Sequence, residues 1–95
     1  AENLETRPER YRLYQNYPNP FNPQTTLRFD VPKGGLVSLK VFNTLGQHVA
    51  TLLEKSMTAG THQFNWDASA LAGGVYFVRM QAGSEFQTIK VLLLN

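Results

Sequence analysis

The sequence predicts an all-β protein, an antiparallel β-sandwich of about seven short strands. Several segments alternate apolar and polar residues, as strands with one buried face do. Turn-forming Gly, Pro and Asn residues separate these segments at intervals of roughly eight to twelve residues. No segment shows the three-to-four-residue periodicity of an amphipathic helix. This spacing is the one expected of immunoglobulin-like and fibronectin-III-like sandwiches.

Length and composition limit what this chain can be. With 95 residues, of which 42% are hydrophobic and 12% aromatic, it has room for one globular domain with a modest core. The net charge of +2 comes from basic residues scattered along the chain, whereas a nucleic-acid interface concentrates them. We therefore expect no nucleic-acid partner. Since the sequence has no cysteine, disulfides and thiolate metal sites are excluded.

The chain is predicted to divide into a polar linker or disordered N-terminal segment, residues 1–12, and a folded domain, residues 13–95. The linker is rich in Glu and Arg and has no useful periodicity. The chain begins with Ala1 rather than Met, so we interpret it as a piece of a larger protein in which any signal peptide lies upstream. No apolar run approaches the length of a membrane span, so no membrane-spanning segment is expected.

A run of prolines and asparagines opens the folded domain. Each proline fixes φ and drives its predecessor toward extended geometry, while asparagine side chains bond nearby backbone groups. We therefore predict a rigid, extended segment that Tyr14, Tyr17 and Phe21 pin to the core. This opening motif consists of Tyr17, Pro18, Asn19, Pro20, Phe21, Asn22 and Pro23.

The strands follow from the alternation. Leu27, Phe29 and Val31 share one face of a strand, which we predict to be the buried one. Phe64 and Trp66 likewise share a face and are placed to enter the core. The expected strands span residues 13–15, 27–31, 37–41, 49–54, 62–66, 74–80 and 86–94.

The turns between these strands have recognisable chemistry. Residues 43–46 fit a type I turn closed by Gly46 at positive φ. Residues 81–84 fit a tight hairpin. Asp67 is expected to bond backbone amides of its own loop.

Neither catalysis nor metal binding is expected. His48 and His62, the only histidines, lack a second histidine or a carboxylate at ligand-like spacing. No serine lies in a nucleophile elbow, and the glycine pairs lack the lysine of a phosphate loop. The carboxylates are spread over different strands and turns, so we interpret them as solvated charges and turn caps: Asp30, Glu54, Asp67 and Glu85. We predict a non-enzymatic domain with no cofactor and no metal.

The C-terminal strand breaks the alternation, because residues 91–94 are all apolar. The residues that do not face the core must face outward unless another segment covers them. One interpretation places this strand between neighbours; the other makes it an exposed, pairing-competent edge that another protein recognises by strand addition. The pattern does not tell which of the three leucines faces the core.

Several linked motifs resemble those of the type A C-terminal sorting domains of the type IX secretion system, found in Bacteroidota. The resemblance begins with residues 13–29, includes the opening motif, and continues through residues 37–49 and 59–62. It resumes at Trp66-Asp67 and at residues 73–77, and it closes on residues 90–94. It therefore covers about residues 13–95, in order and at the family's spacing.

The resemblance implies a non-catalytic, immunoglobulin-like domain that directs a larger cargo protein, to which it is covalently joined, through type IX secretion. The cargo would pass the periplasm in transit and then reach the cell surface or the extracellular space. The implied partners are the outer-membrane translocon and a sortase-like surface protease that cleaves before Leu13. The residues implied in translocon recognition are Lys90, Val91, Leu92, Leu93, Leu94, Gly74, Val75 and Tyr76.

Two other functions stay open from the residues themselves. One is an accessory binding module of an extracellular enzyme, for carbohydrate or another surface polymer; exposed coplanar aromatic residues would favour it. The adjacent Tyr76 and Phe77 leave one aromatic residue facing outward. The other is a structural spacer similar to the immunoglobulin-like part of flagellar hook-capping proteins, which share the Pro-Asn-Pro-Phe opening. Only the linked motifs rank sorting first.

Overall fold

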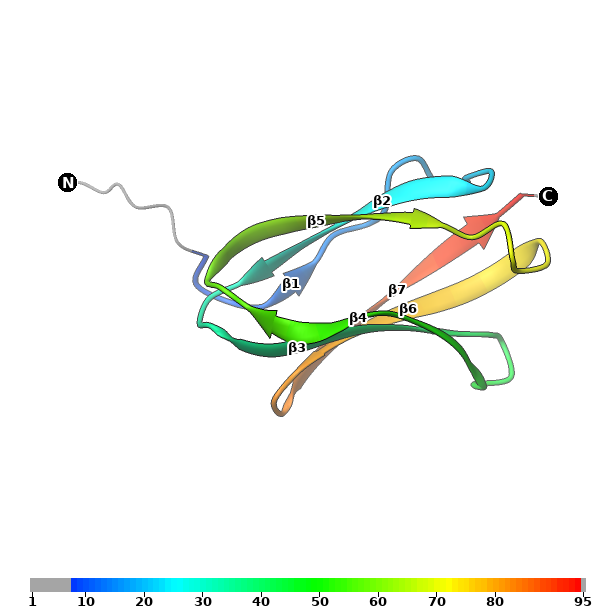
Figure 1. Cartoon of the computed structure of the whole chain (residues 1–95). Coiled ribbons are helices and arrows are strands. Elements are labelled where there is room, and N and C mark those ends of the chain that lie inside the picture. The colour runs from blue at the N-terminus through cyan, green and yellow to red at the C-terminus, as the bar shows by residue number, and fades with distance from the viewer. Residues whose placement is uncertain (1–7, 95) are drawn as a thin grey trace.

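The computed structural model describes residues 8–94, which form a sandwich of two antiparallel sheets (Figure 1). One sheet has three strands in the order β1-β2-β5, and the other has four in the order β4-β3-β6-β7. The strands are β1 (Arg12–Leu13), β2 (Gln24–Val31), β3 (Gly35–Phe42), β4 (His48–Met57), β5 (Gly60–Asp67), β6 (Gly74–Ala82) and β7 (Glu85–Leu93). The predicted seven-stranded β-sandwich of the immunoglobulin-like kind is confirmed.

The core lies between the two sheets and follows the predicted alternation. Leu27, Phe29 and Val31 of β2 are almost completely buried. Trp66 is buried as expected, whereas Phe64 is half-buried against the same core. The four-stranded sheet contributes alternate residues of β3, β6 and β7, namely Val37, Leu39, Val41, Tyr76, Val78, Met80, Val91 and Leu93. Every second residue of these strands therefore stabilises the sandwich through burial of apolar surface.

The predicted turn chemistry is confirmed. Gly46 has φ of 79°, and its amide donates to the carbonyl of Asn43 at 3.0 Å. The Asp67 carboxylate accepts from both the hydroxyl and the backbone amide of Ser69, at 2.6 and 3.0 Å. The hydroxyl bond and then the amide bond hold the pKa of Asp67 below its ordinary value.

The opening motif differs from the prediction. Backbone groups of Tyr17 and Thr26 exchange hydrogen bonds of 3.1 and 3.0 Å, after which the chain bends at residues 18–20 instead of staying extended. Tyr17 lies directly opposite Thr26, and residues in that position point to the same face of a sheet. Since Thr26 faces outward, the Tyr17 side chain also points outward; it is 81% exposed and does not attach the segment to the core as predicted. Phe21 does enter the core, where its ring lies 5.3 Å from that of Trp66, centroid to centroid.

The predicted linker, residues 1–12, falls largely outside the described residues, and its last residue already pairs with Asp30 as part of β1. The interpretation of all carboxylates as solvated charges is wrong for Asp30, which is only 9% exposed. The hydroxyl groups of Tyr14 and Thr61 donate to its two oxygens, at 2.6 and 2.8 Å. Burial is tolerated because both oxygens have hydrogen-bond partners.

Candidate functional site

The last strand, β7, separates its apolar residues into two sets. Val91 and Leu93 are buried, at 0% and 3% exposure, whereas Leu92 and Leu94 are 37% and 47% exposed. Lys90 is exposed on the same side as Leu92 because side chains two positions apart share a face. The structure thus identifies Leu93 as the leucine that belongs to the core.

The opening motif closes the outer edge of β7. The backbone amide of Phe21 donates to the carbonyl of Leu92 at 3.0 Å, and the amide of Leu94 donates to the carbonyl of Phe21 at 2.7 Å. The amide of Leu92 donates to the side-chain oxygen of Asn19, also at 3.0 Å. The expectation of an open, pairing-competent edge is therefore wrong for this part of β7. The alternative, a strand between two neighbours, is closer to the structure.

Two glutamine side chains extend this closure. Gln15 donates from its amide to the carbonyl of Lys90 at 2.8 Å. Gln87 accepts from the amide of Leu13 at 2.8 Å and donates to the carbonyl of Tyr11 at 3.0 Å. Sequence reasoning missed both glutamines, because these three hydrogen bonds join residues that lie between 74 and 76 positions apart along the chain. The one sequence feature that indicated a contact here was the run of apolar residues 91–94, which predicts that another segment packs against this strand.

The neighbouring strand β6 brings the other predicted recognition residues beside β7. Val75 lies opposite Leu92, and Tyr76 lies opposite Val91. Tyr76 is buried, and its hydroxyl donates to the carbonyl of Ala72 at 2.6 Å, so it holds the preceding loop rather than offering a surface. Gly74 has φ of 149° at the start of β6, opposite Leu93. Val75 is partly exposed and shares the outward face of Leu92.

The eight predicted residues therefore fall into two groups. The outward-facing group, which we call the terminal face, consists of Lys90, Leu92, Leu94 and Val75. The supporting group consists of Val91, Leu93, Gly74 and Tyr76. Figure 1 shows that the end of β7 lies at the same end of the sandwich as the β5–β6 loop, opposite to the end where β1 begins.

Nothing in the described part of the chain suggests reaction chemistry. Within residues 8–94, no three His, Cys, Asp or Glu side chains gather closely enough to hold a metal ion. The two histidines lie on different strands, β4 and β5. Their ring nitrogens contact the hydroxyl of Thr51 and the carbonyl of Thr58 respectively. No helix among these residues is long and apolar enough to cross a membrane.

The described residues thus form a small β-sandwich whose terminal strand is held at its outer edge by the opening motif and presents exposed side chains on its outer face. Residues 15–94 match the family model of secretion system C-terminal sorting domains, which is more than half of the chain. The chain belongs to this family. No curated protein matches it.

The family match establishes the function in outline. The domain is a non-catalytic C-terminal sorting signal of a cargo protein handled by type IX secretion. It therefore directs export toward the cell surface or the extracellular space. The sorting function that the linked motifs ranked first is confirmed.

Proposed function

We propose that the outer-membrane translocon recognises this domain through the terminal face, that is, Lys90, Leu92, Leu94 and Val75. The observation that carries this proposal is the division of β7 into buried and exposed residues next to a closed edge. Leu92 and Leu94 are exposed leucines beside an exposed lysine, a combination suited to small apolar pockets with an acidic rim. The supporting group, Val91, Leu93, Gly74 and Tyr76, keeps this face in position.

The closed edge favours docking through side chains over strand addition. A partner strand beside residues 92–94 would have to displace both backbone bonds of Phe21 and the Asn19 bond. It would also have to remove the buried Phe21 ring from its place against Trp66. Truncating a buried phenylalanine typically costs about 3–5 kcal/mol, so displacing this ring is unfavourable. Recognition of exposed side chains requires no such rearrangement.

The proposal also includes the route of the cargo and the cleavage of the chain before β1. The cargo passes the periplasm before the translocon, and a sortase-like surface protease cleaves in the polar segment before Leu13. The polar residues before β1 then act as the linker, and the sandwich that begins with β1 acts as the recognised domain. Two features support cleavage before β1: Glu9 and Arg10 are exposed, and β1 begins at the end of the sandwich opposite to the terminal face.

The proposal is tested with residues 1–95 fused to the C-terminus of a periplasmically targeted fluorescent protein, in a host with and without the type IX translocon. Surface fluorescence is measured for the parent and for Leu92→Asp and Leu94→Asp. Leu36→Asp is the matched control, because Leu36 is a 60% exposed leucine on the outer face of the same sheet. It lies near the opposite end of that sheet, since Ser38, two residues further along β3, pairs with Gln81 next to the β6–β7 hairpin.

The expected result is at least tenfold less surface fluorescence for Leu92→Asp and Leu94→Asp and no change for Leu36→Asp. Circular dichroism must show that all three variants fold. If Leu92→Asp and Leu94→Asp fold and are exported like the parent, the terminal face is not the recognition surface. If the parent itself is not exported by a host with the translocon, the sorting assignment fails for that host.

A further inference from the structure

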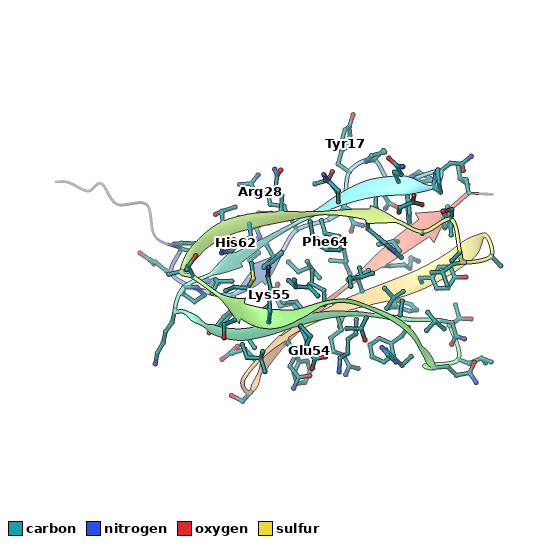
Figure 2. The ribbon with its side chains drawn as sticks, viewed as in Figure 1. Tyr17, Arg28, Glu54, Lys55, His62 and Phe64 are labelled. Atoms are coloured by element: carbon teal, nitrogen blue, oxygen red, sulfur yellow. The ribbon has the colours of Figure 1, made fainter. Side chains whose placement is uncertain are left out.

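The outer face of the three-stranded sheet carries a groove, lined by arginine, tyrosine and glutamine side chains, that is not part of the terminal face. Strands β1, β2 and β5 form its floor, and the residue Tyr17 stands at its border. The groove has a volume of about 630 Å³. Figure 2 shows Tyr17 and Arg28 projecting from this face, away from the four-stranded sheet that bears the terminal face. The residues that matter here are Arg12, Tyr14, Gln15, Tyr17, Arg28 and Gln63.

Two guanidinium groups are held in place at the centre of the groove. The Cζ atoms of Arg12 and Arg28 lie 4.4 and 4.6 Å from the centroid of the Tyr14 ring. The Tyr14 hydroxyl in turn donates to Asp30 at 2.6 Å, which fixes the ring. Cations stacked on a fixed ring lose less side-chain freedom when they bind an anion than free surface lysines do.

The groove is positively charged. Among residues 8–94, none that lines it carries a carboxylate. Asp30 lies opposite Arg12 in the strand register but is 9% exposed, and hydroxyl groups occupy both of its oxygens. Arg28 lies opposite Gln63, a neutral residue. Within residues 8–94, the Arg28 guanidinium stacks on the Tyr14 ring and makes no ion pair, so its N–H groups can bind an anionic ligand.

Tyr17 adds an aromatic surface to this positive groove. Its ring is 81% exposed, although its backbone is fixed by two hydrogen bonds to Thr26. An exposed tyrosine ring offers an apolar face and a polar hydroxyl, and its side chain has only two torsion angles to fix on binding. Beside it, the Gln63 amide can donate to and accept from hydroxyl groups. Gln15 can only accept, through its Oε1, because its NH2 group already donates to Asn16 Oδ1 and to the carbonyl of Lys90, both at 2.8 Å.

We propose that this groove binds an acidic saccharide that carries carboxylate groups. Arg12 and Arg28 bind the carboxylate, Tyr17 packs against the apolar face of a sugar ring, and the two glutamine amides bond ring hydroxyls. Two cations are too few for a nucleic-acid backbone, whose affinity comes from many phosphate contacts. The lining has no aliphatic pocket for the side chains of an acidic peptide. This site is separate from the terminal face, and neither proposal depends on the other.

The test uses residues 1–95 and isothermal titration calorimetry with two probes of the same backbone. Tetragalacturonate carries the carboxylates, and its fully methyl-esterified form lacks the charge. The variants are Arg28→Gln and Tyr17→Ala. Arg79→Gln is the matched control: it removes the same charge from the other sheet, where the Arg79 guanidinium lies 4.8 Å from the Phe42 ring centroid.

The parent is expected to bind tetragalacturonate with a Kd below about 1 mM and to bind the methyl ester at least tenfold more weakly. Arg28→Gln should weaken binding about tenfold or more, since it removes a charge-assisted bond. Tyr17→Ala should weaken it about fivefold, and Arg79→Gln less than twofold. In NMR spectra of the parent, the side-chain amides of Gln15 and Gln63 should shift on titration.

Three results would overturn the proposal. The first is no binding of tetragalacturonate at several millimolar. The second is equal affinity for the acid and its ester. The third is an equal loss in Arg28→Gln and Arg79→Gln, which would show attraction to net charge and no specific site. Circular dichroism and unchanged backbone NMR shifts away from each substitution confirm that the variants fold, so every loss reports on binding.

Discussion

Replacing Leu93 with alanine is expected to destabilise the domain far more than the same change at Leu92, its neighbour in sequence. Leu93 is 3% exposed in the core, where truncation to alanine costs about 2–5 kcal/mol. Leu92 is 37% exposed on the outer face, so the change leaves no cavity and costs about 1 kcal/mol or less. A domain of this size has a free energy of unfolding of roughly 5–14 kcal/mol. The change at Leu93 therefore removes a large share of the total.

Urea unfolding followed by fluorescence measures this difference, because Trp66 is buried and is the only tryptophan. With a typical urea dependence of about 1–3 kcal/mol per molar, Leu93→Ala should lower the midpoint by about 1 M or more. Leu92→Ala should lower it by less than half as much. Equal shifts, or a larger shift for Leu92→Ala, would refute the assigned register, because a slip of one residue exchanges the two faces of a strand.

Three other changes test separate contacts. Phe21→Ala should cost about 3–5 kcal/mol in urea unfolding, since the ring is 1% exposed, and should speed hydrogen exchange of the Leu92 and Leu94 amides. Gly83→Ala should lower the free energy of unfolding, measured by thermal unfolding, by about 1–2 kcal/mol. The φ angle of Gly83 is 61° and an added methyl group would meet no atom within 4 Å, so this loss comes from backbone strain alone. The hydrogen bond to Asp30 raises the pKa of Tyr14, so the stability from this group is present below about pH 10 and is lost as the pH rises through the folded-state pKa. Tyr14→Phe should flatten this alkaline loss in thermal unfolding between about pH 8 and 11; an unchanged pH profile would contradict that origin.

Where the alternation is regular, the sequence was sufficient to predict burial. Leu27, Phe29 and Val31 enter the core as predicted, because a strand exposes alternate residues to opposite faces whatever its partners are. The turn at Gly46 was equally predictable, since a glycine at positive φ is a local requirement. Local rules of this kind explain why the fold class and the number of strands followed from the sequence.

The candidate site was predictable only in part, because it depends on contacts between distant residues. The four consecutive apolar residues at positions 91–94 do not show which face of the strand is buried, so the sequence did not distinguish Leu93 from Leu92. The exposure of Tyr17 depends on its pairing with Thr26, and the closed edge of β7 depends on Asn19 and Phe21. None of these pairings has a local signature.

One short segment supports both proposed binding surfaces. Asn19 and Phe21 hold the edge of β7 behind the terminal face. Tyr17 borders the groove on the other sheet, and Gln15 both lines that groove and bonds the carbonyl of Lys90. The family match begins at Gln15, so this segment is part of what defines the domain. The proline-asparagine run thus connects the two sheets, because Tyr17 pairs with Thr26 of β2 and Phe21 pairs with Leu93 of β7. This segment occupies backbone groups of Leu92 and Leu94, and for that reason we propose that recognition of β7 depends on its outward side chains.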